Sequence, residues 1–274
     1  MEVFDCFTFN DELEVIDIRF HTLDKYISKF IIVESNKTHQ GNKKKINFNI
    51  KYFRKFEKKI KYLQLDDTLL LDKKNNDLNS WIRENNQRNF ISKGLQDCSN
   101  EDIILISDAD EIPNLAKINF HNLKEKVYAF EQLNYMYKLN LLRSDKWIGT
   151  KLCKYKYLKS PQWLRSLKVH KKYSYLRIDK IFSNDYIHNY KIIKNGGWHF
   201  GWMKKPEGII NKLNSFAHTE YNKKKFKNKN YINNVIKNRI NFLNDETLKI
   251  VRINNSFPTY INKNLKKFSN WIIK

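Results

Sequence analysis

Hydrophobic positions in the N-terminal part of the chain follow two periods in turn. Residues 4–10 and 30–34 are short apolar runs that predict buried strands, and the second run ends in a carboxylate. Between them, Leu13, Ile16 and Phe20 recur at the spacing of one helical face. A strand, a helix and a strand in this order are the repeating unit of a parallel α/β sheet.

The same pattern continues through the next segments. Residues 46–56 and 81–95 predict helices, and residues 60–65 predict a third strand, with polar connectors between them. The strongest strand signal is Ile103–Ile106, four aliphatic residues of which three are β-branched, as expected for a strand buried on both faces. Pro113 ends this segment, because proline cannot donate a backbone hydrogen bond to a sheet.

Three carboxylates follow the Ile103–Ile106 strand, at Asp108, Asp110 and Glu111. Open α/β sheets bind ligands at the carboxyl ends of their strands. Asp108 and Asp110, separated only by an alanine, could therefore converge on one hard cation through oxygen ligands. The alternative is an acidic loop or helix N-terminus, where carboxylates favour the helix dipole. The buried strand directly before the carboxylates favours the metal site.

Beyond residue 115 the pattern is less regular. Residues 127–142 are aromatic and extended, and residues 196–202 predict an aromatic strand flanked by glycines. Helices are predicted over residues 206–216, starting at a proline, and over residues 231–243. The chain has no internal repeat and no low-complexity linker.

Length and composition favour one large folded unit. The 274 residues are 41% hydrophobic and 14% aromatic, enough for a sizeable core. No apolar run reaches the roughly 18–20 residues of a membrane-spanning helix, and the acidic N-terminus lacks the features of a signal peptide. The three cysteines are widely spaced and match neither a zinc site nor a disulfide framework. We therefore expect a cytoplasmic location.

The net charge is +23, from 52 basic and 29 acidic residues. Such a charge attracts polyanions, among them nucleic acid, anionic membrane surfaces and phosphorylated glycans. The densest clusters, Lys43–Lys45 and Lys223–Lys225, suggest peripheral attachment to an anionic membrane. Lysine and asparagine are abundant throughout, however, so compositional drift in an AT-rich genome explains the charge equally well.

Six segments in a fixed order resemble glycosyltransferase family 17, which includes the enzymes that add bisecting β-1,4-N-acetylglucosamine to N-glycans. These segments are Phe9–Glu14, Val33–His39, Trp81 with Gln87-Arg88-Asn89, Ser107–Pro113, Gly197–Phe200 and Pro206–Ile209. Each is weak alone, but together they cover residues 3–220. The resemblance implies a GT-A fold, a Rossmann-like, mostly parallel sheet flanked by helices, and a bacterial or viral member of the family.

The resemblance also implies a domain layout. The GT-A catalytic domain would span residues 1–220, with a nucleotide-binding half over residues 1–115 and an acceptor half over residues 116–220. Residues 221–274 would form a basic helical extension that the resemblance covers poorly.

The implied activity is a metal-dependent, inverting transfer of a sugar, with N-acetylglucosamine expected, from a UDP-sugar donor to a glycan, glycolipid or glycoprotein hydroxyl. Asp110 would hold Mn²⁺ or Mg²⁺, and Asp108 would lie toward the donor sugar and ribose. The metal would neutralise the charge that develops on the leaving diphosphate. The residues do not choose between the two metals, because both accept oxygen ligands.

Four further residues are candidates for donor binding. Thr8 and Phe9 end the first predicted strand and would line the nucleotide pocket. Glu34 ends the second strand and could accept hydrogen bonds from uracil or ribose, an interpretation that we favour over a surface cap. Arg88 could donate bidentately to the diphosphate or form an ion pair on its helix.

An inverting transfer needs a general base. Glu207 is the first candidate, because it opens a helix whose N-terminus would keep the carboxylate ionised. A plain helix N-terminal charge is the alternative interpretation. Glu220, Glu131 and Asp145 are the other candidates.

Histidine and tryptophan side chains complete the expected site. His199, or else His218, could supply a third metal ligand, although a lone histidine in an aromatic strand is more often structural. Trp198 and Trp202 offer flat apolar faces for an acceptor sugar, with a core role as the alternative.

Two other classes of protein are weighed against the transferase. The charge and the aspartates would suit a nucleic-acid-binding protein or a metal-dependent nuclease, but no helix-turn-helix, zinc finger or RNA-stacking motif is present. An inactive glycan-binding relative would not need the intact Asp108 and Asp110 pair.

Overall fold

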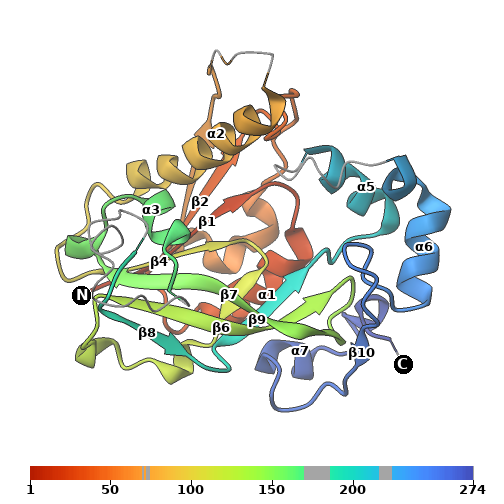
Figure 1. The fold of residues 1–274 in the computed structure, drawn as a ribbon. Coiled ribbons are helices and arrows are strands. Elements are labelled where there is room, and N and C mark those ends of the chain that lie inside the picture. Colours follow the sequence, from red (N-terminus) through yellow and green to blue (C-terminus); the bar gives the residue numbers. More distant parts are fainter. Residues whose placement is uncertain (70, 72–74, 170–185, 216–223, 274) are drawn as a thin grey trace, which may run out of the picture.

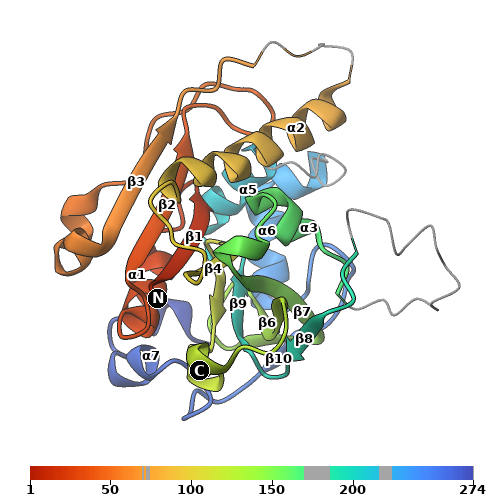
Figure 2. The same ribbon diagram turned by 90° about the vertical axis from the view of Figure 1, so that its left-hand side faces the viewer.

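A computed structural model describes residues 1–69, 71, 75–169, 186–215 and 224–273. These residues form one curled sheet with helices on both sides (Figures 1 and 2). Five of the strand pairings among the described residues are parallel and four are antiparallel. The predicted α/β class is therefore confirmed, with a larger antiparallel share than the sequence indicated.

The parallel half contains the four N-terminal strands. They are β1 (Val3–Phe9), β2 (Lys29–Ser35), β3 (Ile60–Leu65) and β4 (Ile103–Asp108). Their order in the sheet is β3-β2-β1-β4. Thr8 pairs in register with Asp108, so the carboxyl ends of β1 and β4 lie side by side. The predicted strands in this half are thus confirmed.

The second half is built around a long antiparallel pair. Its strands are β5 (Glu111–Pro113), β6 (Val127–Met136), β7 (Leu141–Lys154), β8 (Tyr190–Ile193), β9 (Gly197–Gly201) and β10 (Lys249–Ile250). β7 runs antiparallel to β4 and so joins the two halves into one sheet. The short β5 pairs antiparallel with β9, which sets Glu111 opposite His199.

Helices cover both faces of the sheet. On one face, α1 (Leu13–Leu23) and α7 (Thr259–Lys263) pack over alternate side chains of β1 and β2, including Phe7 and Phe30. On the other face, the segment after α2 (Asn76–Asn89) and helix α3 (Pro161–Ser166) cover Phe4, Cys6 and Ile31. The strands are therefore buried on both faces, as their apolar runs predict.

Three predicted helices differ in detail. The segment predicted as a helix over residues 46–56 is a 3₁₀ segment at Ile50–Lys59. α2 begins five residues before Trp81, because the side chain of Asn75 caps its first turn by accepting from the N–H of Leu78. The helix predicted over residues 231–243 is α6 (Lys229–Lys237).

The C-terminal residues pack against the antiparallel half. β10 pairs with the start of β7, and the N–H of Leu139 donates to the carbonyl of Trp271 at 2.8 Å. Asn140 exchanges two hydrogen bonds with the backbone of Ile273. A third apolar cluster joins α5 (Pro206–Ser215) and α6 to the β6–β7 connection. None of the helices in the described ranges is long and apolar enough to cross a membrane.

Candidate active site

A cavity of about 650 Å³ lies at the carboxyl ends of β1 and β4. α2, the loop after β2, β7, β9 and α5 complete its walls. Six basic and five acidic side chains line it: Lys37, Lys44, Arg88, Arg143, Arg165 and Lys212, with Glu12, Glu84, Asp108, Asp110 and Asp145. This is the edge at which open α/β sheets bind ligands.

Two arginines hold Asp108. Its Oδ1 accepts from Arg88 at 3.0 Å, and its Oδ2 accepts from Arg165 of α3 at 2.7 Å. Burial opposes the charge of Asp108, but Arg165 and Arg88 outweigh it and hold the pKa of this carboxyl far below its usual range. Asp108 is therefore an ionised carboxylate with both oxygens already paired.

Asp110 faces different partners on the opposite side of the turn. Its Oδ1 lies 3.7 Å from Nε2 of His199, and its Oδ2 lies 3.3 Å from Nζ of Lys212. The backbone carbonyl of Asp110 accepts from the N–H of Phe200, which ties the turn to β9. The two aspartates are separated by one residue, yet Asp108 faces two arginines and Asp110 faces a histidine and a lysine.

A hydrogen-bonded chain fixes the orientation of His199. Its Nδ1 lies 2.9 Å from Oδ1 of Asn134, and Nδ2 of Asn134 donates to Oδ1 of Asp145 at 3.1 Å. Because an amide oxygen can only accept, Nδ1 carries a proton, and Nε2 is the ring nitrogen that faces Asp110. The indole of Trp147 stacks on the imidazole with ring centres 4.7 Å apart.

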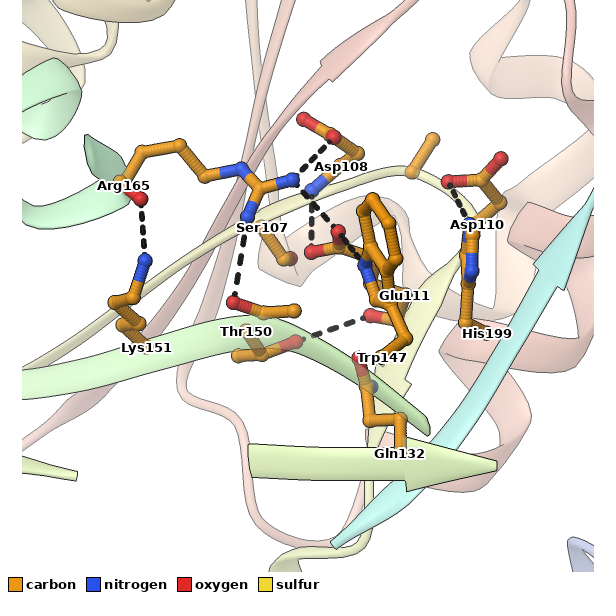
Figure 3. Close-up of polar contacts among 12 residues, drawn as sticks. Ser107, Asp108, Asp110, Glu111, Gln132, Trp147, Thr150, Lys151, Arg165 and His199 are labelled. Atoms are coloured by element: carbon orange, nitrogen blue, oxygen red, sulfur yellow. Dashed lines mark hydrogen bonds and ion pairs between the residues drawn. The ribbon is translucent and has the colours of Figure 1, made fainter. Parts of the chain in front are cut away.

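Glu111 is a fully buried carboxylate that holds side chains of the site in place through hydrogen bonds. Oε1 accepts from the indole N–H of Trp147 at 2.6 Å and from Arg165 at 2.8 Å. Oε2 accepts from the backbone N–H of Asp108 at 3.1 Å. Figure 3 shows Trp147 and Arg165 converging on Glu111, while His199 faces Asp110. This role of Glu111 could not be predicted from the sequence, because its partners Trp147 and Arg165 lie 36 and 54 residues away.

Arg19 of α1 is a second buried residue that the sequence pattern missed. Its guanidinium pairs with both oxygens of Asp5 and donates to the carbonyls of Asp108 and Glu111 and to Oγ of Ser107. An arginine among the apolar residues of an amphipathic helix is the signal that could have identified it, because a buried charge requires partners.

Glu12 is also part of the cavity. Its Oε2 accepts from the N–H groups of Asn10 and Asp11, and Lys204 lies 3.7 Å from its Oε1. Although burial opposes its charge, Lys204, Lys212 and these N–H groups lower the pKa of Glu12 to about 2. The carboxylate therefore holds the backbone at the end of β1 in place.

Several predicted site residues do meet in the cavity. Thr8 and Phe9 line it from the end of β1, and Arg88 lines it from α2, where it also pairs with Glu84. Asp145 and Trp202 line the opposite wall, on β7 and after β9. These donor and acceptor candidates thus share one cavity with Asp108, Asp110 and His199.

Glu34 does not line this cavity. It is fully buried and accepts from Nζ of Lys44, the N–H groups of Asn47 and Phe48, and the hydroxyl of Tyr62. Four protein donors already fill its two oxygens, so the carboxylate fixes the loop after β2 in place of the ligand role that the sequence suggested.

Glu207 also lies outside the cavity. Its side chain is 55% exposed and pairs with Lys229 at 2.5 Å, and this hydrogen bond lowers its pKa. The structure gives no support to the base role expected for it, because a base must reach the reacting hydroxyl.

Two more candidates, Trp198 and Glu131, are not in the lining. Trp198 is a core residue whose indole N–H donates to the carbonyl of Ser256, and Glu131 on β6 does not reach the cavity. Glu220 and His218 lie outside the described residues.

Asp110 and His199 could share a divalent cation. Their facing atoms are 3.7 Å apart, close enough for both to contact one ion with bonds of about 2.1 Å. Across the described ranges, no group of three or more histidine, cysteine or acidic side chains is arranged to hold a metal. Among the described residues, a cation bound by this pair would therefore need its remaining ligands from a substrate or from water.

The chain is similar in sequence to known proteins. The chain is 24% identical over 237 residues to beta-1,4-mannosyl-glycoprotein 4-beta-N-acetylglucosaminyltransferase from Rattus norvegicus, and equally to the protein of the same name from Homo sapiens. The matches cover 80% of this chain but 43% and 44% of those proteins, so the chain spans less than half the length of its curated relatives.

Among solved structures, HddC from Yersinia pseudotuberculosis aligns with 72% of this chain and 92% of its own, at 11% identity. The TM-score of 0.32 is too low to indicate a shared fold. The model of glycosyltransferase family 17 matches residues 1–246, which is most of the chain. The chain belongs to glycosyltransferase family 17.

Proposed function

We propose that this protein transfers N-acetylglucosamine from a UDP-sugar to a glycan hydroxyl, with inversion at the anomeric carbon and on a GT-A type of fold. One observation carries the proposal. A single cavity at the carboxyl ends of β1 and β4 joins the Asp110–His199 pair to the two arginines on Asp108. Family membership and the names of the curated relatives supply the sugar and the reaction class.

Asp110 and His199 would hold Mn²⁺ or Mg²⁺. The bond from His199 to Asn134 leaves Nε2 free to act as a ligand, and both metals commonly combine one or two protein ligands with substrate phosphates. When bound, the metal would neutralise charge on the leaving diphosphate. Asp108 is a weaker candidate ligand, because Arg88 and Arg165 occupy its oxygens.

The nucleotide would occupy the side of the cavity formed by Thr8, Phe9 and the loop after β2. Arg88 and Arg165 would stabilise the diphosphate, since guanidinium groups donate in a geometry that matches phosphate oxygens. In this role Asp108 orients the two arginines and keeps their charge close to the end of β4.

Asp145 is the proposed general base. It lines the acceptor wall near Trp202, its side chain is 46% exposed, and it is joined through Asn134 to His199. A partly exposed carboxylate in this wall can accept the proton of an incoming sugar hydroxyl as that oxygen attacks the anomeric carbon. Trp202 and Trp147 would contact the apolar faces of the sugars.

A donor screen tests this function. Release of UDP or GDP would be measured with a panel of UDP-sugars and GDP-sugars and N-glycan acceptors, with Mn²⁺, with Mg²⁺ and with a chelator. We expect turnover with UDP-N-acetylglucosamine and metal, and its loss in Asp110→Ala. Turnover that is unchanged by the chelator would contradict the metal role, and a preference for GDP-sugars would contradict the donor.

A further inference from the structure

Lys212 holds a positive charge against the carboxylate that we propose as a metal ligand. It extends from α5 into the cavity, where Nζ lies 3.3 Å from Oδ2 of Asp110. The other oxygen of Asp110 faces His199. The Lys212 side chain is only 17% exposed, so solvent screens this pair poorly.

The surroundings of Lys212 direct its ammonium toward Asp110. The indole ring of Trp202 lies 5.2 Å from Nζ and provides an aromatic face for the cation. Glu12 contributes to the field around Lys212, but its own oxygens are taken by backbone N–H groups and Lys204. Within the part of the chain that the structure describes, Asp110 is the one carboxylate in ion-pair contact with Lys212.

A lysine in this position has opposite effects on the two proposed ligands. A divalent cation on Asp110 would be repelled by the ammonium and would share a carboxylate with it. A nucleoside diphosphate carries several negative charges and would be attracted by the same ammonium. With both ligands present, the diphosphate can separate the like charges and accept from Lys212.

We propose that Lys212 couples metal binding to nucleotide binding, by weakening the metal in the empty site and by donating to the diphosphate in the loaded site. This inference rests on the proposed function of the cavity. Coupling between two ligands is reciprocal, so a metal that binds better with nucleotide also makes the nucleotide bind better. In the absence of donor, the lysine leaves Asp110 paired.

The first test measures Mn²⁺ affinity alone, by titration calorimetry or by electron paramagnetic resonance of free Mn²⁺. We expect Lys212→Met to bind Mn²⁺ about tenfold more tightly than the wild type, a change equivalent to about 1.4 kcal/mol. Lys212→Arg keeps the charge and should stay close to the wild type. Lys205→Met, an exposed lysine at the start of the same helix that does not line the cavity, is the matched control. Equal or weaker Mn²⁺ affinity in Lys212→Met would overturn the proposal.

The second test measures UDP affinity with saturating Mn²⁺ and with a chelator. We expect Lys212→Met to bind UDP more weakly in both conditions, and the gain in UDP affinity from Mn²⁺ to fall about tenfold, with melting temperatures confirming that the variants are folded. A wild-type protein that binds Mn²⁺ but no UDP would refute the donor and the inference together. A wild type that transfers sugar, with Lys212→Met unchanged in both titrations, would refute the inference alone.

Discussion

The indole N–H of Trp147 donates a 2.6 Å hydrogen bond to Oε1 of Glu111, which joins the middle of β7 to the acidic turn after β4. The same indole stacks on His199, and the same carboxylate holds Arg165. His199, proposed for metal binding, and Arg165, proposed for diphosphate binding, are therefore both held in place through Glu111, which does not itself line the cavity.

Glu111→Gln should therefore be damaging although it changes one atom. Oε1 and Oε2 accept from three donors in total, and an amide must turn its NH₂ toward at least one of them. We expect a loss of about 1–3 kcal/mol in the free energy of unfolding and a fall in kcat. Urea unfolding and steady-state kinetics measure both. Glu101→Gln, an exposed carboxylate on surface lysines, is the control and should change little; equal effects in the two variants would contradict the role of Glu111.

Arg165→Met should weaken nucleotide binding strongly. It removes one of the two arginines on Asp108 and leaves Glu111 with an uncompensated charge, so we expect UDP affinity to fall by tenfold or more, about 1.4 kcal/mol or above. Calorimetric titration with UDP and Mn²⁺ measures this. Arg54→Met, at an exposed arginine, serves as the control. UDP affinity retained by a folded Arg165→Met protein would argue against a diphosphate contact.

Asn134→Leu should reduce metal affinity although Asn134 is not itself a proposed metal ligand. The amide oxygen of Asn134 keeps the proton on Nδ1 of His199, and loss of such a partner typically costs about 10–100-fold in metal affinity. Mn²⁺ titration of the variant and of Asn233→Leu, at an exposed position on α6, tests this. An unchanged Mn²⁺ affinity would show that His199 needs no such orientation or is not a ligand.

Asp145→Asn should lose transfer and keep UDP binding. Asparagine preserves the shape of the side chain but cannot take the acceptor proton, so kcat should fall by about 10²–10⁴-fold. Glu207→Gln, at the exposed start of α5, should remain close to the wild type. The reverse result, an inactive Glu207→Gln with an active Asp145→Asn, would return the base to the helix start.

Lys151 should make stability depend on pH. Burial, assisted by the nearby charge of Arg165, lowers its pKa to about 7, and its Nζ donates to the carbonyl of Arg165. The pKa in the unfolded chain is about 10.4. Between these values the unfolded chain binds more protons, so this group makes the free energy of unfolding rise with pH, by up to about 1.4 kcal/mol per unit. The loss of stability with falling pH therefore runs from about pH 10.4 and is complete near pH 7, below which Lys151 is protonated in both states.

Lys151→Met tests that slope, because methionine has no titrating group. Urea unfolding at pH 7, 8 and 9 should show the wild type gaining stability over this range relative to the variant. Lys58→Met, at an exposed lysine on the 3₁₀ segment before β3, should follow the wild type. Parallel curves for Lys151→Met and the wild type would mean that Lys151 stays charged in the folded protein.

The parallel half could be predicted from the sequence because its signals are local. The strand at Ile60–Leu65 was predicted with its observed bounds, and Asp108 and Asp110 follow the predicted Ile103–Ile106 strand and line the cavity. For both strands the apolar run and the polar residues that end it lie within a few positions of each other. Hydrophobic periodicity carries this information directly.

The partners of those carboxylates could not be predicted, because they come from distant segments. Arg165 and Trp147 reach the site only after β7 pairs with β4, and the register of that pairing depends on tertiary packing. Glu34 was predicted to bind the donor because it ends a buried strand. Its hydrogen-bond donors Asn47 and Phe48 belong to a loop with no periodic pattern, so they could not be predicted. Glu207 had a favourable position at a helix start, but the sequence does not indicate which way the helix faces.

Arg19 holds the backbone of the acidic turn from the core, so that only the side chains facing the cavity are free to change in evolution. Because its guanidinium binds the carbonyls of Asp108 and Glu111 from within the core, the path of the chain is fixed independently of the side chains that face the cavity. Selection can then exchange those side chains and alter donor or metal preference while the backbone stays where it is. Arg19 itself has no such freedom, since lysine lacks the planar set of donors that these acceptors require.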